Sequence, residues 1–73
     1  MAAGELSLEA VRRLIVRSGV ERISEKATEE LRSTLERIAD TIARKAIGLA
    51  SHAGRKTVKA QDVRLAVSSI LRD

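Results

Sequence analysis

The sequence contains no cysteine, no aromatic residue and no proline. Without cysteine, the chain can form neither disulfide bonds nor thiolate metal sites. Its single histidine, His52, has no second histidine with which to build a metal site. The sequence therefore predicts a protein that holds neither a metal ion nor a cofactor.

The missing side chains also exclude several functions. No Cys or Tyr is present to act as a nucleophile or acid, and a chain of 73 residues has little room for a substrate cleft. We therefore expect no enzymatic activity. Binding of single-stranded nucleic acid relies on aromatic stacking, so the absence of aromatic residues argues against such a partner. The core must be built from Leu, Ile, Val and Ala.

Long apolar runs are absent as well. No stretch approaches the roughly 20 apolar residues that a membrane span needs. The first residues, MAAGELSLEA, have neither the positive start nor the apolar centre of a secretory signal. We expect a protein without a membrane partner that stays in the cytoplasm, where the chromosome or nucleoid of a cell without a nucleus lies.

The length predicts one domain over residues 1–73, with no basic tail. A chain this small buries only about 60% of the surface that its unfolded form exposes. Small domains usually add disulfides, a metal or a partner chain. Because the first two are excluded, self-association remains, and we expect an obligate dimer.

The positions of apolar residues predict an all-α protein. They recur at helical spacing in three stretches, residues 8–18, 25–53 and 60–71. Ser7 and Ser24 suit N-cap positions, and Gly54 suits the end of the second helix. That helix carries a row of small residues, Ala39, Ala43, Ala46, Ala50 and Ala53. At about 42 Å it is too long for two short helices to cover, whereas a second copy crossing it can do so.

The charges point to an anionic partner. The net charge is +4, and no acidic residue lies between Asp40 and Asp62. Six basic residues lie in that span: Arg44, Lys45, His52, Arg55, Lys56 and Lys59. A second group lies in and after the first helix: Arg12, Arg13, Arg17 and Arg22. A basic loop beside a helix N-terminus suits phosphate binding, since Thr57 and backbone N–H groups add directed donors.

Two blocks of sequence carry a specific resemblance. Residues 52–67, HAGRKTVKAQDVRLAV, resemble the second loop and third helix of archaeal histones, and residues 14–24, LIVRSGVERIS, resemble the end of their first helix and first loop. The distance between the blocks matches that family without a gap. The resemblance covers residues 6–71 and implies the histone fold, an intertwined head-to-tail dimer in which the first loop of one chain pairs with the second loop of the other.

The resemblance also implies where DNA binds. Arg22 matches an arginine inserted into the minor groove, Lys56 and Thr57 match second-loop contacts, and Arg13 matches a basic residue of the first helix. Arg12 and Lys59, from the same basic groups, complete the predicted DNA-binding set. This scheme needs no base contacts, because charge and DNA deformability suffice.

Four further positions match contacts within and between dimers. Arg55 and Asp62 match an intrachain bridge from the second loop to the third helix, with direct phosphate contact as the alternative for Arg55. Leu49, His52 and Asp62 match a dimer–dimer contact, with a solvated helix end as the alternative for His52.

Two glycines complete the predicted set. Gly19 matches a small loop residue that lets superhelical turns stack closely. Gly48 stands where a long side chain is more usual, one turn before His52. We expect it either to let the apposed dimer approach more closely or to weaken that contact.

The predicted function is sequence-nonspecific binding, bending or wrapping, and compaction of double-stranded DNA. Homodimers, or heterodimers with a paralogue, would assemble on DNA into tetramers or longer superhelical filaments. The alternative is a histone-fold heterodimerisation module of a transcription-related complex, against which Arg22, Lys56 and Thr57 argue. A sequence-specific helix-turn-helix regulator is disfavoured, because the third helix offers mainly Gln61 and Arg64 for reading bases.

Overall fold

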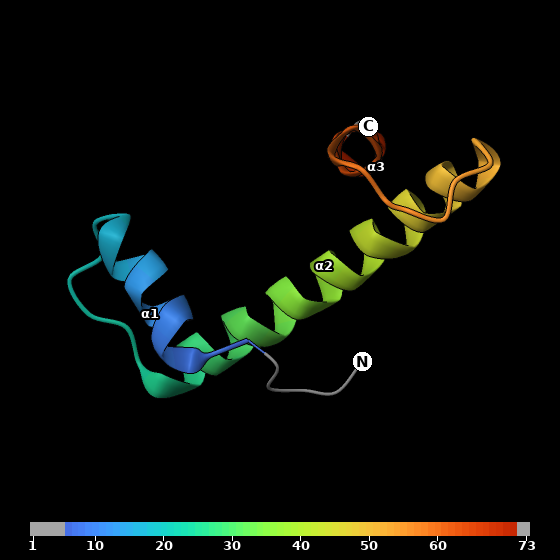
Figure 1. Ribbon diagram of the computed structural model, residues 1–73. Helices are drawn as coiled ribbons and strands as arrows, with labels where there is room; N and C mark the ends of the chain where they lie inside the picture. The colour runs from blue at the N-terminus through green and yellow to red at the C-terminus, as the bar shows by residue number, and fades with distance from the viewer. Residues whose placement is uncertain (1–5, 72–73) are drawn as a thin grey trace. The chain divides into compact units, whose positions relative to one another are not determined.

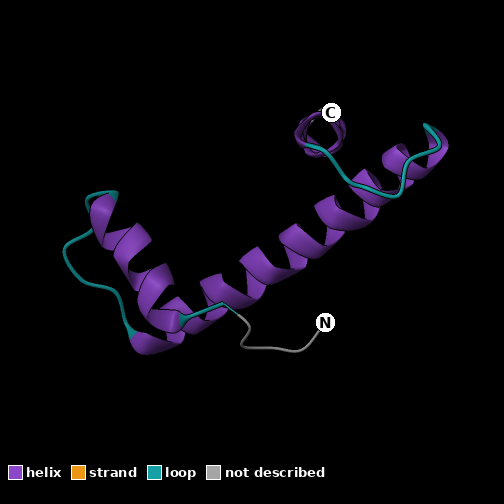
Figure 2. Ribbon diagram, viewed as in Figure 1, coloured by secondary structure: helices purple, strands orange, loops and turns teal. Residues whose placement is uncertain are grey.

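The computed structural model describes residues 6–71, which form three helices and no strand. These are α1 (Leu8–Arg17), α2 (Glu25–His52) and α3 (Ala60–Leu71), joined by two loops (Figures 1 and 2). The predicted order of short, long and short helices is confirmed. The first two helices each end one residue before the predicted position, because Ser18 and Ala53 belong to the turns that follow.

Serine and glycine define the ends of α1. Ser7 has an extended backbone, with φ −69° and ψ 130°, and its hydroxyl accepts a hydrogen bond from the N–H of Ala10 at 3.1 Å. This bond satisfies one of the free N–H groups of the first turn. After the last turn, Gly19 has φ +110°, a conformation that side chains disfavour. Helix α1 is thus capped at its start and stopped by glycine.

The ends of α2 follow the same logic. The hydroxyl of Ser24 accepts the backbone N–H three residues later at 3.1 Å. At the other end, Gly54 has φ +77° and donates its N–H to the Ser51 carbonyl at 2.9 Å. The N–H of Arg55 reaches back to the Ala50 carbonyl, also at 2.9 Å. This pair of bonds is a Schellman motif, which needs a left-handed residue and therefore favours glycine.

The backbone divides into two compact units, residues 1–37 and 38–73. In the first unit, α1 packs on the first part of α2. The side chains of Val11 and Thr28 are buried, and the carboxylate of Glu36, also buried, accepts a hydrogen bond from the N–H of Leu6 at 2.8 Å. This bond ties the segment before α1 to α2.

In the second unit, α3 packs on the C-terminal part of α2. The buried contact is made of small residues, Ala46 and Ala50 from α2 and Ala66 from α3. Two members of the predicted alanine row therefore lie where a neighbouring helix comes close.

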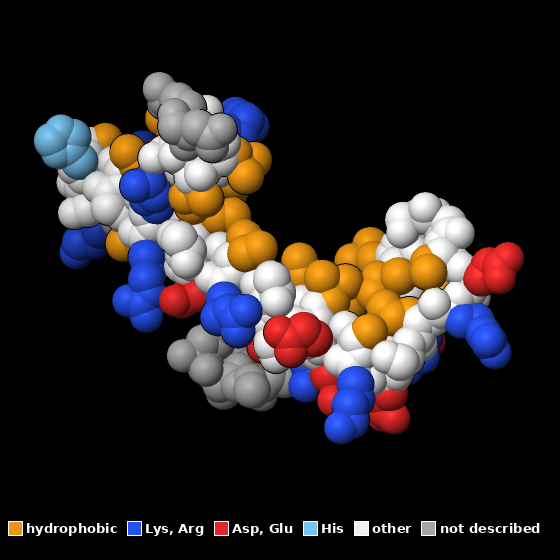
Figure 3. Space-filling view, turned by 180° about the vertical axis from the view of Figure 1, so that it is seen from behind, with side chains coloured by type: hydrophobic (Ala, Val, Ile, Leu, Met, Phe, Trp, Pro, Cys, Tyr) orange, Lys and Arg blue, Asp and Glu red, His pale blue; other side chains and the backbone are white. Residues whose placement is uncertain are grey.

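The single chain leaves much of its apolar surface uncovered. Among the described residues, the buried hydrophobic side chains are Val11, Ala46, Ala50 and Ala66. The large hydrophobic side chains that remain exposed are Leu6, Leu14, Val16, Val20, Ile38, Ile47, Val58, Val63, Leu65, Ile70 and Leu71. Figure 3 shows hydrophobic side chains open at the surface of both units. Burying such surface stabilises a protein by about 25 cal/mol per Å², so this chain gains strongly from a partner.

None of the helices within residues 6–71 combines the length and the hydropathy that crossing a bilayer requires.

Candidate nucleic-acid interface

The first loop presents one exposed arginine. Arg22 lies between α1 and α2, and its side chain forms no ion pair with any described residue. The neighbouring Glu21 is exposed as well. A guanidinium that has no carboxylate partner keeps its five donors available for phosphate oxygens.

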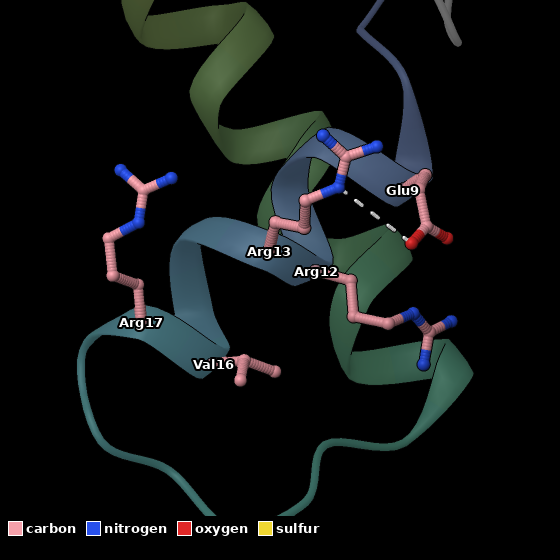
Figure 4. Close-up of a pocket in the computed structure, with 5 residues that line it drawn as sticks. All are labelled: Glu9, Arg12, Arg13, Val16 and Arg17. Carbon is pink, nitrogen blue, oxygen red and sulfur yellow. Dashed lines mark ion pairs between the residues drawn. The ribbon is translucent and has the colours of Figure 1, made fainter.

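Helix α1 carries the second group of basic residues. Arg12 and Arg13 line a shallow hollow of about 340 Å³ together with Glu9, Val16 and Arg17 (Figure 4). Arg13 forms a loose ion pair with Glu9, with 4.0 Å between Nε and Oε2 and both side chains exposed. Arg17 was not in the predicted DNA-binding set. Its spacing of four residues from Arg13 is the sequence signal that places both on one side of the helix.

The second loop is fixed to α3 by a bidentate ion pair. Arg55 donates from Nη1 to Oδ2 of Asp62 at 2.8 Å and from Nη2 to Oδ1 at 2.9 Å. Arg55 Nη1 also donates to the carbonyl of Thr57 at 2.9 Å, and the N–H of Lys59 donates to Asp62 Oδ2 at 2.8 Å. The last bond caps α3, because Lys59 is its N-cap and Asp62 its third residue.

These bonds explain the electrostatics of Asp62. The hydrogen bonds from Arg55 and from the N–H of Lys59 lower the pKa of Asp62 to about 2, since they favour the charged carboxylate. The same ion pair raises the pKa of Arg55. The side chain of Asp62 is only 3% exposed. Of the two roles considered for Arg55, the structure therefore has the intrachain bridge.

The remaining loop-2 residues point away from this bridge. Lys56, Thr57 and Lys59 are exposed. Neither lysine forms an ion pair within the described part of the chain. The bridge thus holds the backbone of the loop in place and leaves two ammonium groups and a hydroxyl free to meet an anion.

A second hollow, of about 480 Å³, lies between α2 and α3 and contains two of the predicted dimer–dimer residues. Gly48 and Leu49 line it together with Arg44, Lys45, Leu65 and Ser69. A Cβ added to Gly48 would meet nothing within 4 Å. Arg44 is held by an ion pair to Asp40 at 2.9 Å, and this hydrogen bond raises the pKa of Arg44.

The other predicted contact residues do not line this hollow. His52 is exposed at the end of α2, and Asp62 is buried beneath Arg55. Gly19 is exposed in the first loop, and a Cβ there would also meet nothing within 4 Å. The dimer–dimer and stacking roles of these residues stay predictions.

The described residues contain no cluster of three or more His, Asp or Glu side chains that could hold a metal ion. The polar groups gathered in the two loops and on α1 are instead cations and donors. Three helices in short, long and short order, with exposed basic loops and an uncovered apolar surface, define the histone class of DNA-binding proteins.

Comparison with known proteins gives the same class. A family model described as "Histone-like transcription factor (CBF/NF-Y) and archaeal histone" matches residues 5–67. The chain is 51% identical over 65 residues to a subunit of the archaeal histone HAN1 of Thermococcus zilligii, and the match covers 89% of this chain and 97% of the relative. It is 44% identical over 63 residues to probable archaeal histone 3 of Methanocaldococcus jannaschii, covering 86% and 94%.

A eukaryotic protein, histone H4 of Dictyostelium discoideum, is 44% identical over 54 residues, which is 74% of this chain and 50% of that histone. The chain belongs to the family of archaeal histones and histone-like transcription factors. It has the histone fold and is a DNA-binding chromatin protein rather than an enzyme.

Proposed function

We propose that this protein compacts double-stranded DNA without sequence preference, bending or wrapping it around dimers that assemble into tetramers or longer superhelical filaments. We place it on the chromosome or nucleoid, in the cytoplasm. One observation carries the proposal: Arg22 in the first loop and Lys56 in the second are exposed and form no ion pair with a described residue. Their charge is therefore available to phosphates.

The functional unit in this proposal is an intertwined head-to-tail homodimer. Residues such as Leu14, Ile47 and Leu65 are more than half exposed in the single chain, which favours a partner of the same apolar character. The long helices would cross, residues 1–73 of each chain would act as one domain, and the first loop of one chain would pair with the second loop of the other. Each end of the dimer would then present Arg22 beside Lys56 and Thr57.

Binding in this scheme is electrostatic. Arg22 would enter the minor groove, Lys56, Thr57 and Lys59 would contact phosphates, and Arg12 and Arg13 would contact phosphates from α1. If each dimer neutralises about 6 to 10 phosphates, its affinity should fall by about 10³ to 10⁵ between 50 and 200 mM salt. A nearly flat salt response would contradict the proposal.

Assembly of dimers would use the second unit. Leu49 and His52 of one dimer would face another dimer, with His52 near Asp62. A carboxylate offers four acceptor positions, and Asp62 uses three of them within its own chain, so one on Oδ1 remains. Gly48 would set how closely the dimers approach, and Gly19 how closely superhelical turns stack.

Nuclease digestion of long, mixed-sequence DNA saturated with the purified protein tests this function. A ladder of protected lengths with a constant increment is expected if dimers polymerise along wrapped DNA. The double variant Arg22→Gln, Lys56→Gln is the matched control, and it should lose protection. A single short protected length would limit the function to isolated dimers or tetramers, and no protection at low salt would remove the packaging role.

A second candidate is pairing with a different histone-fold chain. One relative is named as part of a histone with more than one kind of chain, and the family description includes transcription factors. Native mass spectrometry of the purified chain separates the candidates. A stable species of twice the 7.9 kDa chain mass supports the homodimer. An unfolded or aggregated chain that becomes ordered only with a second histone-fold chain supports the heterodimer.

A further inference from the structure

The basic surface of α1 is larger than the DNA-binding set described above. Its hollow is lined by Arg12, Arg13 and Arg17 together with Glu9 (Figure 4). These side chains carry three positive charges and one negative charge, so the formal charge is +2. Without Arg12 and Arg17 it would be zero, because the charge of Glu9 would cancel that of Arg13. The net attraction of α1 for an anion therefore depends on Arg12 and Arg17.

The ion pair between Glu9 and Arg13 is open to exchange. Its atoms are 4.0 Å apart, and the side chains of Arg13 and Glu9 are 71% and 66% exposed. A pair at this distance and exposure holds its partners only weakly. A phosphate oxygen can thus replace the Glu9 carboxylate at Arg13, while Glu9 repels that phosphate.

Arg17 is well placed to share in this contact. It follows Arg13 by four residues, which is about 6 Å along the helix axis and about 40° around it. Phosphates of one DNA strand rise by about 3.4 Å per nucleotide along the duplex axis, so two side chains with this spacing can reach neighbouring phosphates. Arg17 is exposed and forms no ion pair with a described residue.

A purely structural role competes with this one. Arg17 lies in the last turn of α1, where any cation interacts favourably with the helix dipole. Such a role would act on the stability of the protein and leave its dependence on DNA and salt unchanged. The two roles therefore predict different measurements.

We propose that Arg13 and Arg17 together bind adjacent phosphates of one strand of duplex DNA, and that Glu9 is a counter-charge that limits the strength of this contact. The inference rests on the proposed function, because it adds a contact to the same DNA-binding surface. It makes Arg17 a DNA-binding residue and gives Glu9 a tuning role.

The experiment is a salt titration of the full-length protein with a mixed-sequence duplex, followed by fluorescence anisotropy between 50 and 200 mM KCl. Loss of one phosphate contact per chain lowers the slope of log affinity against log salt by about 1.8 per dimer. For Arg17→Gln, we therefore expect the fall in affinity over this salt range to be roughly tenfold smaller. Arg64→Gln is the matched control, since Arg64 is exposed on α3, outside the hollow, and loses the same charge.

Glu9→Gln tests the same idea in the opposite direction. It should raise the affinity at every salt concentration, which a poorly folded variant would not do. If Arg17→Gln matches Arg64→Gln in slope, or lowers only the thermal stability without DNA, the inference is wrong. If Arg22→Gln lowers the slope and Arg17→Gln does not, only this inference is lost. If neither variant lowers it, the proposed DNA-binding surface is lost as well.

Discussion

Replacing Gly48 by alanine should stabilise the protein. Gly48 lies inside α2, where glycine costs about 1 kcal/mol relative to alanine because it has more backbone freedom to lose on folding. A Cβ at this position meets nothing within 4 Å, so the new methyl group adds no clash. A dimer contains two such positions, and the expected gain is about 2 kcal/mol per dimer.

This gain converts into a measurable shift of the thermal unfolding midpoint. For a protein of about 150 residues, 1 kcal/mol moves the midpoint by roughly 2–4 °C, so we expect a rise of about 4–8 °C for the dimer. The assay is circular dichroism at the helical band, without DNA, at fixed protein and salt concentrations, because dimer stability depends on both. Gly54→Ala is the control. Its φ of +77° is unfavourable for alanine, and its midpoint should fall.

An unchanged or lowered midpoint for Gly48→Ala would refute the reasoning. That result would mean that the space beside Gly48 is filled in the assembled protein, by a partner chain that a methyl group displaces. Repeating the measurement over a hundredfold range of protein concentration would then test this, since a filled interface makes the penalty grow as higher assemblies form.

Three other perturbations have defined outcomes. Because the folded-state pKa of Asp62 lies at about 2, below its ordinary value of 3.8, its carboxylate contributes stability that is present above pH 4 and lost as the pH falls towards 2. Urea titrations should show Asp62→Asn less stable than the native protein at pH 6 and equal to it near pH 2. Ser7→Ala removes the cap of α1 and should cost about 1 kcal/mol per chain in the same titration, whereas Ser7→Asp should restore it. Arg22→Gln should lower the salt slope of DNA binding by about 1.8 per dimer without moving the unfolding midpoint; a large drop of the midpoint would assign Arg22 a structural role instead.

The helices could be placed from sequence because their ends are decided locally. Ser7, Ser24 and Gly54 each act within four residues, and the structure has all three in the predicted roles. The ends at Arg17 and His52 were missed by one residue. There the next N–H still bonds back into the helix while the residue itself already belongs to the turn, and a sequence pattern does not separate these two conditions.

Contacts between distant residues were not predictable in the same way. The buried carboxylate of Glu36 accepts the N–H of Leu6, thirty residues away, and no periodicity announces that bond. The apolar residues of α2 could be recognised from their spacing, but spacing does not say which chain covers them. For the same reason, Arg17 stood in a recognised basic group without a role until its neighbours in the hollow were known.

The bridge between Arg55 and Asp62 makes the two loops mechanically unlike. Loop 2 is pinned by four hydrogen bonds from Arg55 and Lys59, and it therefore keeps its shape before any ligand arrives. In loop 1, no side-chain hydrogen bond involves residues 19–23 of the described chain. If the loops pair across a dimer, each DNA-binding end joins a rigid half to an adaptable one. The rigid half would hold the register on the phosphates, while the adaptable half lets Arg22 follow a minor groove whose width changes with sequence.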